Sequence, residues 1–449
     1  MRGLAGQRGI QAAFRYGCQL HLHARCERSH VVSVARTARA PVVAPHLADD
    51  RRLALRESAW ALLSSRALIW VAGGFTALIA GPRRLAANSL NHHYLATPFH
   101  STVANVLVAP AARWDSVWFL GIAHLGYHKV DQAVFFPLYP ALVAAGGAVL
   151  GGGTGVNLVV GILLSCGCAL GALYLVRRLT TLELGADVAD NAVWIYAWLP
   201  VALFLSAVYT EALFLLLTVG SFYAGRTGRW WLAGLLGVLA AATRNGGILL
   251  IVPLLVLYLY GPRTDRPSDF QGNGIKPRYR LRRDVLWIAA VPVGLAAYLA
   301  YLKLTLGHAL IPFSEQSHWH RSFAPLGGIP AGLWLGLKSL AAGVHMGDVR
   351  KVVELGCLAL ALWLLWKSWK RLPLAYTAYA AIALALAVSG PTPGEPLRSL
   401  PRFTLVIFPL WIALALWATE RRRVSVVLCA CAPLVVVWTI LFTSWTWAA

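Results

Sequence analysis

The sequence predicts an all-α protein that crosses a membrane many times, and three observations lead to this fold class. The 449 residues are 58% hydrophobic and only 13% charged, whereas a soluble domain carries roughly 25% charged residues. The mean hydropathy is high, at +0.62. Several continuous apolar runs approach the ~20 residues that a spanning helix needs. Examples are the runs 60–80, 285–306 and 424–443.

The strong positive charge has a membrane explanation and does not indicate a nucleic-acid partner. The formal net charge is +22, but the arginines stand in short clusters between apolar runs, as the positive-inside rule produces. We therefore expect the anionic partner to be a lipid headgroup or a phosphate on a lipid substrate. Most of the seven cysteines lie inside apolar runs, where Cys behaves as a small hydrophobe, so they predict helix packing and no metal site.

The composition divides the chain into a tail and a membrane domain. Residues 1–58 hold ten arginines against four acids and show no sustained periodicity, which is typical of a disordered basic tail on the cytoplasmic side. Residues 59–449 are expected to form the membrane domain. Within it, 81–133 is the predicted first outer loop, and 307–350 is a second outer loop that includes an interfacial segment.

The basic clusters predict the topology. The arginines of 51–56 precede the first span, so the N-terminus is expected inside. All later clusters can share that side if 134–152 and 331–346 are interfacial or re-entrant segments. This scheme gives about 11 spans with the C-terminus outside. It leaves the pair 83–84 on the outer side, and its middle inverts if 134–152 does span.

On this topology the outer surface collects nearly every polar residue that chemistry could use. The residues come from five segments that are far apart in sequence, and a shared outward-facing active site explains that gathering best. They are Asp115 in 81–133, Glu211 in "SAVYTE", Arg244 in "TRNGG", Glu315, His318, His320 and Arg321 in 307–328, and Arg398 and Arg402 in 394–403.

Asp115 is the first candidate catalytic residue. It stands among Trp114, Trp118 and Phe119, and an acid in apolar surroundings is costly unless it has a use. One interpretation is a general base that takes the proton of an attacking sugar hydroxyl. The alternative is an N-cap for a helix that begins at Ser116, since Asp is a good capping residue.

The other candidates also have a functional and a structural interpretation. Glu211 could serve the site or only favour the helix dipole from a first turn. Arg244 precedes two glycines that allow a tight reversal, and both it and Arg402 suit bidentate phosphate contact. The structural alternative for both arginines is snorkelling. The prolines of "FFPLYP" at 135–140 disfavour a regular helix through that stretch and fix how the chain enters the membrane.

The stretch "HWHR" at 318–321 raises the question of a metal. Two histidines two residues apart on a loop have no third strong ligand at a fixed spacing, so we expect this stretch to bind a lipid phosphate or a sugar. No cofactor is predicted, and no ligand pattern supports a divalent cation.

These motifs resemble those of a known family. "RWDSVWFLGIAHLGY" followed by "FFPLYP" is similar to the signature of the PIG-V mannosyltransferases, which belong to the GT-C class of multi-span glycosyltransferases. "YTEALF", "TRNG" and "LPRF" resemble further blocks of that family in the same order. The resemblance covers roughly residues 60–420.

The resemblance implies a GT-C-type helical bundle, a polyprenyl-phosphate-mannose donor, an outward-facing active site and an essential acid in the first outer loop, which falls on Asp115. Direct displacement assisted by one base would invert the anomeric centre. The residues expected to bind substrate are Arg113, Trp114, Tyr139, Tyr209, Glu211, Arg244, Asn245, His318, His320, Arg321 and Arg402.

The acceptor is less defined than the donor. An Arg-rich, Ala-rich and Lys-poor composition is typical of a high-GC bacterium, so we expect the plasma membrane of a bacterium and a lipid-linked or protein acceptor. The competing class is a transporter or flippase for a lipid or sugar. Transporters often place ionisable groups near the membrane midplane within repeats, whereas here the acids lie at the predicted outer boundary and no internal repeat is found.

Overall fold

The computed structural model describes residues 47–88, 91, 95–270, 276–318, 320–343 and 348–446. Most of the predicted tail 1–58, up to residue 46, and the last residues of the predicted segment 331–346 lie outside the described residues. Within these ranges the secondary structure is helical, and the only β pairing is a bridge between Thr392 and Glu395. The all-α prediction is therefore confirmed.

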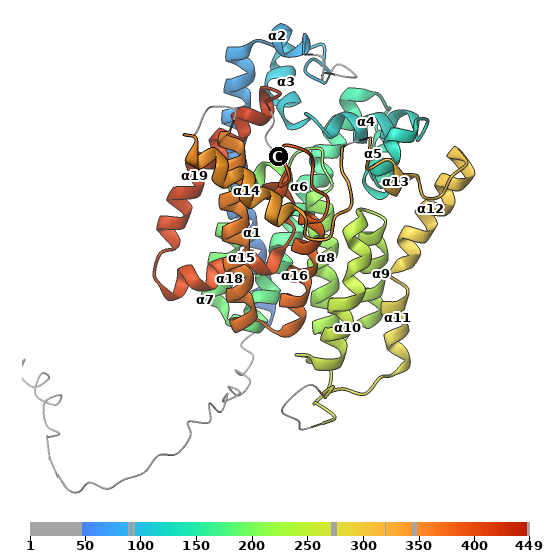
Figure 1. Cartoon of the computed structure of the whole chain (residues 1–449), viewed down its shortest axis with the longest axis vertical. Coiled ribbons are helices and arrows are strands. Elements are labelled where there is room, and N and C mark those ends of the chain that lie inside the picture. The colour runs from blue at the N-terminus through green and yellow to red at the C-terminus, as the bar shows by residue number, and fades with distance from the viewer. Residues whose placement is uncertain are drawn as a thin grey trace, which may run out of the picture. The chain divides into compact units, whose positions relative to one another are not determined.

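The helices follow one another along the chain as Figure 1 shows, with long connections after α2, α10, α13 and α16. They are α1 (Leu47–Ala80), α2 (Pro82–Ala86), α3 (Thr102–Leu107), α4 (Ser116–Leu125), α5 (Leu138–Val149), α6 (Thr154–Leu184), α7 (Ala186–Ala197), α8 (Glu211–Arg226), α9 (Trp230–Ala241), α10 (Ile251–Tyr260), α11 (Leu286–Ala289), α12 (Pro292–Leu306), α13 (Ile311–Ser314), α14 (Gly328–Ala341), α15 (Val349–Arg371), α16 (Leu374–Val388), α17 (Leu400–Leu405), α18 (Phe408–Glu420) and α19 (Val424–Thr443).

Helix α8 lies at the centre of the packing. It contacts α6, α9 and α10, and nearly all of its residues are buried. A helix that is apolar on every side belongs in the interior, and Figure 1 shows α8 between α9 and α10 on one side and α16 on the other. The two ends of α8 therefore fix two separate polar regions, one near Glu211 and one near Arg226.

Four described helices are long and apolar enough to cross a membrane, or up to five if a bent pair counts as one span. The four are Arg51–Ala80, Thr154–Leu184, Arg283–Leu306 and Val424–Thr443, and the bent pair joins Thr102–Ala111 to Ser116–Leu125 at 105°. Five further apolar helices have 10–17 residues, and α5 is among them. At 1.5 Å per residue, α5 is about 18 Å long and too short to cross the ~30 Å hydrocarbon layer.

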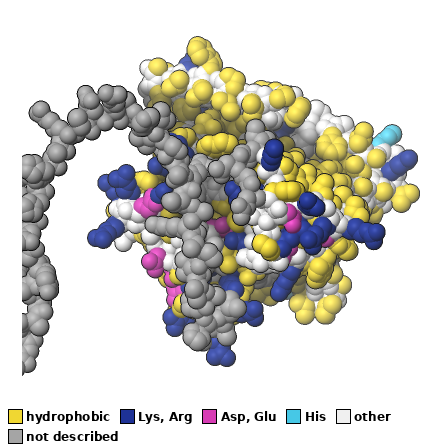
Figure 2. Space-filling model, turned by 90° about the horizontal axis from the view of Figure 1, so that it is seen from below, with side chains coloured by type: hydrophobic (Ala, Val, Ile, Leu, Met, Phe, Trp, Pro, Cys, Tyr) yellow, Lys and Arg dark blue, Asp and Glu magenta, His cyan; other side chains and the backbone are white. Residues whose placement is uncertain are grey.

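The basic clusters gather around the Arg226 end of α8. Arg226 pairs with Glu183 at 2.6 Å, and the hydroxyl of Tyr376 donates to the same carboxylate at 3.0 Å. Arg371 pairs with Glu420 on the neighbouring α18. Figure 2 looks onto the lower end of Figure 1, where Lys and Arg side chains gather among fewer Asp and Glu. The segments that the sequence assigns to the cytoplasm thus meet at one end of the bundle.

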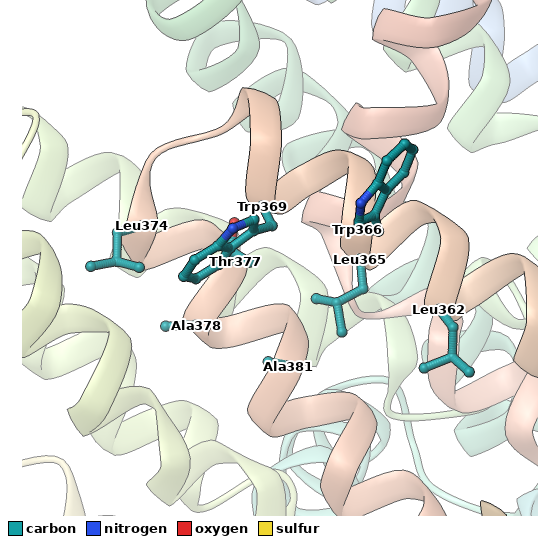
Figure 3. Close-up of a pocket in the computed structure, with 8 residues that line it drawn as sticks. All are labelled: Leu362, Leu365, Trp366, Trp369, Leu374, Thr377, Ala378 and Ala381. Atoms are coloured by element: carbon teal, nitrogen blue, oxygen red, sulfur yellow. The ribbon is translucent and has the colours of Figure 1, made fainter. Parts of the chain in front are cut away.

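A shallow apolar groove also lies toward this end, between α15 and α16, with a volume of about 370 Å³. Figure 3 shows the residues that line it. They are Leu362, Leu365, Trp366 and Trp369 of α15 and Leu374, Thr377, Ala378 and Ala381 of α16. The only polar side chain among these lining residues is that of Thr377, and its hydroxyl is hydrogen-bonded to that of Ser368 at 3.1 Å. The lining is therefore apolar. None of its residues belongs to the polar region around Glu211.

Candidate active site

The first element of the site is the sharp turn that carries Asp115. Residues 112–115 fill the break between the two halves of the bent pair, and Trp114 adopts a left-handed conformation with φ 55°. A non-glycine residue in this region stores about 1–3 kcal/mol of strain and persists only where its surroundings hold it. The turn must therefore be held by contacts from elsewhere in the chain.

Tyr209 supplies one such contact. Its hydroxyl accepts a hydrogen bond from the amide of Asp115 at 3.1 Å and donates one to the carbonyl of Arg113 at 3.2 Å. These two bonds connect the two sides of the turn at Trp114. Next to it, the hydroxyl of Ser116 donates to the carbonyl of Val208 at 3.1 Å. The loop before α8 thus fixes the position of Asp115, and Tyr209, which the sequence predicts to bind substrate, holds this turn through its hydroxyl.

The Asp115 side chain does not cap α4. Asp115 occupies the N-cap position, but its side chain makes no capping hydrogen bond. Its carboxylate instead accepts a hydrogen bond from Arg402 Nη1 at 2.5 Å, and the side chain is 32% exposed. The capping alternative is therefore wrong for the described geometry, and the carboxylate is directed toward the other polar groups predicted for the site.

Glu211 lies behind this pair. It is the first residue of α8 and only 1% exposed. Its Oε1 atom lies 2.7 Å from Arg244 Nη1 and 3.5 Å from Arg402 Nε. A buried carboxylate needs such partners, so Glu211 joins the two arginines as well as favouring the dipole of α8.

Arg402 connects the two acids. Burial lowers the pKa of its guanidinium, but the nearby carboxylates of Asp115 and Glu211 outweigh burial and hold that pKa above its ordinary value. Arg402 is one-tenth exposed and pairs with both acids, so snorkelling into a headgroup layer does not describe it.

A phenyl ring stands among the cations. The guanidiniums of Arg244, Arg321 and Arg402 lie over the ring of Phe403, at 5.6, 5.3 and 5.3 Å from its centroid. Phe403 is half-buried on α17. Sequence reasoning missed this residue, although it is the last residue of the motif "LPRF". An aromatic residue beside an arginine in the sequence does not indicate by itself that the ring will contact arginines.

The glycines after Arg244 act differently from the prediction. Residues 245–250 form a 3-10 helix, and neither glycine has a positive φ, so no left-handed reversal is made. A Cβ atom on Gly247 would lie 2.3 Å from the carbonyl of Ala240, whereas one on Gly246 would meet no atom closer than 3.4 Å. Gly247 therefore allows α9 and the following turn to approach closely, and this brings Arg244 to the site.

Two residues predicted to bind substrate are engaged inside the protein. Arg113 has no exposed surface and donates to the carbonyls of Leu95, Ala109, Ala112 and Thr443. Tyr139 is equally buried, and its hydroxyl bonds to the carbonyl of Gly161 and the hydroxyl of Ser165. Both side chains are buried and hydrogen-bonded inside the protein in this structure, and their predicted contact with substrate stays a prediction.

The remaining predicted residues lie at the surface around the cluster. Trp114 is half-buried and stacks at a tilt on Trp445, with 6.3 Å between ring centroids. Asn245, His318 and His320 are exposed. Among the described side chains, no group of three His, Cys, Asp or Glu could hold a metal ion.

Comparison with known proteins relates this site to a family. Residues 64–258 match the family described as mannosyltransferase (PIG-V). The segment 64–258, called the PIG-V segment below, is therefore similar to the PIG-V mannosyltransferases. It contains Asp115, Tyr209, Glu211 and Arg244, while Arg321, Arg402 and Phe403 lie beyond it and complete the cluster from the C-terminal half.

Curated relatives of this PIG-V segment are named GPI alpha-1,6-mannosyltransferase 2. The chain is 30% identical to the Cricetulus griseus protein over 210 residues, covering 44% of this chain and 42% of that one. It is 33% identical to the Mus musculus protein over 213 residues (44% and 41%) and 26% identical to the Homo sapiens protein over 219 residues (46% and 44%). The chain thus spans less than half the length of these relatives.

Among solved structures, the chain is similar to an oligosaccharyltransferase of Archaeoglobus fulgidus. The crystal structure with Zn and sulfate is 16% identical and has a TM-score of 0.37, with 74% of this chain and 48% of that chain covered. The apo form is 12% identical and has a TM-score of 0.38, with 86% and 56% covered. These scores are too low to support a fold assignment.

Proposed function

We propose that this protein is a membrane mannosyltransferase that moves a mannosyl residue from a polyprenyl-phosphate-mannose donor to a hydroxyl of a lipid-linked or protein acceptor outside the cytoplasm. The observation that carries the proposal is the contact between Asp115 and Arg402. It joins an acid of the PIG-V segment to a cation 287 residues away, 2.5 Å from it.

The cluster contains the two kinds of group that this reaction needs. Asp115 is partly exposed, and the hydrogen bond to Tyr209 fixes the turn that carries it. A general base must likewise be accessible to the acceptor hydroxyl and held in position. Arg402, Arg244 and Arg321 supply fixed positive charge for the phosphate that leaves with the polyprenyl chain. Attack from the side opposite the phosphate would invert the anomeric centre, turning a β-linked donor into an α-linked product.

The membrane arrangement that goes with this function is also a proposal. The protein is an integral membrane protein with several candidate spans. We propose that it is a GT-C-type bundle of about 11 spans in a bacterial plasma membrane, with a tail at 1–58, a membrane domain at 59–449 and outer loops at 81–133 and 307–350. The separation of the Glu211 and Arg226 ends by the 16 residues of α8, about 24 Å, supports an outer site and an inner basic rim.

The function is tested directly by reconstitution. Purified protein in liposomes with a polyprenyl-phosphomannose carrying isotope-labelled mannose is expected to produce a labelled glycolipid or glycoprotein, which mass spectrometry identifies when membranes of a deletion strain supply the acceptor. Movement of intact labelled donor across the bilayer without any new mannosyl linkage would favour the transporter class and reject the proposal.

The orientation is tested with a matched pair of lysines. Lys129 lies after α4 and Lys276 in the loop after α10, and both are exposed. After replacement of the native cysteines, Lys129→Cys is expected to react with an impermeant thiol reagent in intact cells, and Lys276→Cys only after permeabilisation. Labelling of Lys276→Cys alone in intact cells would invert the topology.

A further inference from the structure

The contacts of Phe403 call for an explanation beyond core packing. Three guanidiniums from three separate segments meet over this one half-buried ring, at 5.3 to 5.6 Å from its centroid. Arg402 precedes the ring on α17, Arg244 comes from the turn after α9, and Arg321 comes from the loop after α13. Like charges brought together in this way repel one another, so their gathering has to be compensated.

Among the described residues, carboxylates form ion pairs with only two of the three cations. Arg244 pairs with Glu211, and Arg402 pairs with both Glu211 and Asp115. No carboxylate in the described part of the chain forms an ion pair with Arg321. Burial, and after it repulsion from Arg402 and Arg398, lowers the pKa of the Arg321 guanidinium to about 10, which leaves it charged at neutral pH.

The guanidinium of Arg321 contacts the ring of Phe403. A guanidinium within ≈ 6 Å of an aromatic centroid is attracted by the negative face of the ring, more strongly when both are removed from water. This attraction does not neutralise the cation. A carboxylate in the same place would do so, and would compete with an anionic ligand.

We propose that Phe403 is a positioning residue that holds Arg321 beside Arg402 and Arg244, so that the three guanidiniums form one cradle for the phosphate of a polyprenyl-phosphate ligand. The proposal rests on the proposed function for the identity of the ligand. In this division of roles, Arg402 and Arg244 are tied to acids, and Arg321 is the cation whose charge remains available to the phosphate.

The test uses farnesyl phosphate as the probe, with farnesol as the matched ligand that lacks the phosphate. Phe403→Leu keeps an apolar side chain but removes the aromatic face. It is expected to weaken farnesyl phosphate binding to the purified protein by roughly tenfold, the size of one or two partly desolvated cation–π contacts, and to leave farnesol binding unchanged. Phe403→Tyr keeps the face and should bind as the wild type does.

Two controls separate positioning from a merely structural role. Phe222→Leu makes the same change at a fully buried ring that packs on Tyr376, Tyr379 and Phe408, so it should lower the melting temperature without changing either affinity. In an Arg321→Gln background, Phe403→Leu should cost much less than it does alone, because its main partner is already gone.

The outcomes distinguish this proposal from the proposed function. Equal farnesyl phosphate affinity in Phe403→Leu and wild type, equal loss in Phe403→Leu and Phe403→Tyr, or no binding by the wild type would each overturn the cradle. Binding with the expected pattern but without mannose transfer would keep the cradle and reject the mannosyltransferase.

Discussion

Asp115→Asn is expected to lower the turnover of mannose transfer by at least about 100-fold, because general-base catalysis contributes ~10²–10⁴-fold. The amide is nearly the same size as the carboxylate and can still accept the hydrogen bond from Arg402, but it cannot take a proton at neutral pH. The loss should therefore appear in kcat, measured with labelled donor, while the affinity for farnesyl phosphate is kept. Asp115→Glu should also be poor, since a shift of about 1 Å can cost ~10²-fold.

The control for Asp115→Asn is a measurement of the melting temperature, which shows whether the variant is still folded. The strained turn at Trp114 is held through backbone groups by Tyr209, and the substitution does not touch these bonds. The protein should therefore still fold, with a melting temperature lowered only by the loss of the charge that faces Arg402. If Asp115→Asn retains more than about a tenth of wild-type turnover, the loss is smaller than a general base should cause. Asp115 is then not the base. The candidates would then be Glu211, which is buried, or Glu315, which is half-buried.

Arg402→Ala is expected to have the second large effect, a loss of about 10²–10³-fold in turnover, as for removal of one preorganised donor to a developing charge. It leaves Asp115 without the ion pair and Glu211 with Arg244 alone. Arg402→Lys should recover only part of the activity, since a point charge cannot contact two acids and a phosphate as the planar guanidinium does. The measurement is donor kinetics, with kcat and KM reported separately.

Two matched arginines bracket the effect of Arg402→Ala. Arg244→Ala should cost less, because Arg244 pairs with one acid and its side chain is twice as exposed, at 20% against 10%. Arg371→Ala breaks an exposed ion pair with Glu420 at the other end of the bundle and should leave donor kinetics unchanged, as expected for surface pairs. Wild-type kinetics in Arg402→Ala would mean that this arginine does not serve the phosphate.

The sequence predicted the helical membrane class and the gathering of Asp115, Glu211, Arg244, Arg321 and Arg402, because apolar runs and charged motifs can be read directly from the chain. It could not show which polar group beside a motif points inward. Arg113 and Asp115 are two residues apart, yet one faces four carbonyls and the other faces a cation.

Contacts that depend on several segments were also beyond the sequence. Tyr209 is hydrogen-bonded to a turn 94 residues away in the sequence. The ring of Phe403 contacts arginines from two other segments. Span lengths could not be read from the sequence for a related reason. An apolar run does not show where a helix breaks. The segments Thr102–Ala111 and Ser116–Leu125, for example, meet at a bend of 105°.

The close approach at Gly247 bears on how distant members of this group could be found. A Cβ atom there would lie 2.3 Å from the backbone of Ala240, while one on Gly246 would make only ordinary contacts with Leu386 and Phe214. The second glycine of "TRNGG" should therefore tolerate no substitution and the first should tolerate alanine. A search profile that gives high weight to Arg244 and to Gly247, with any small residue between Asn245 and Gly247, should recover relatives that the literal motif would miss.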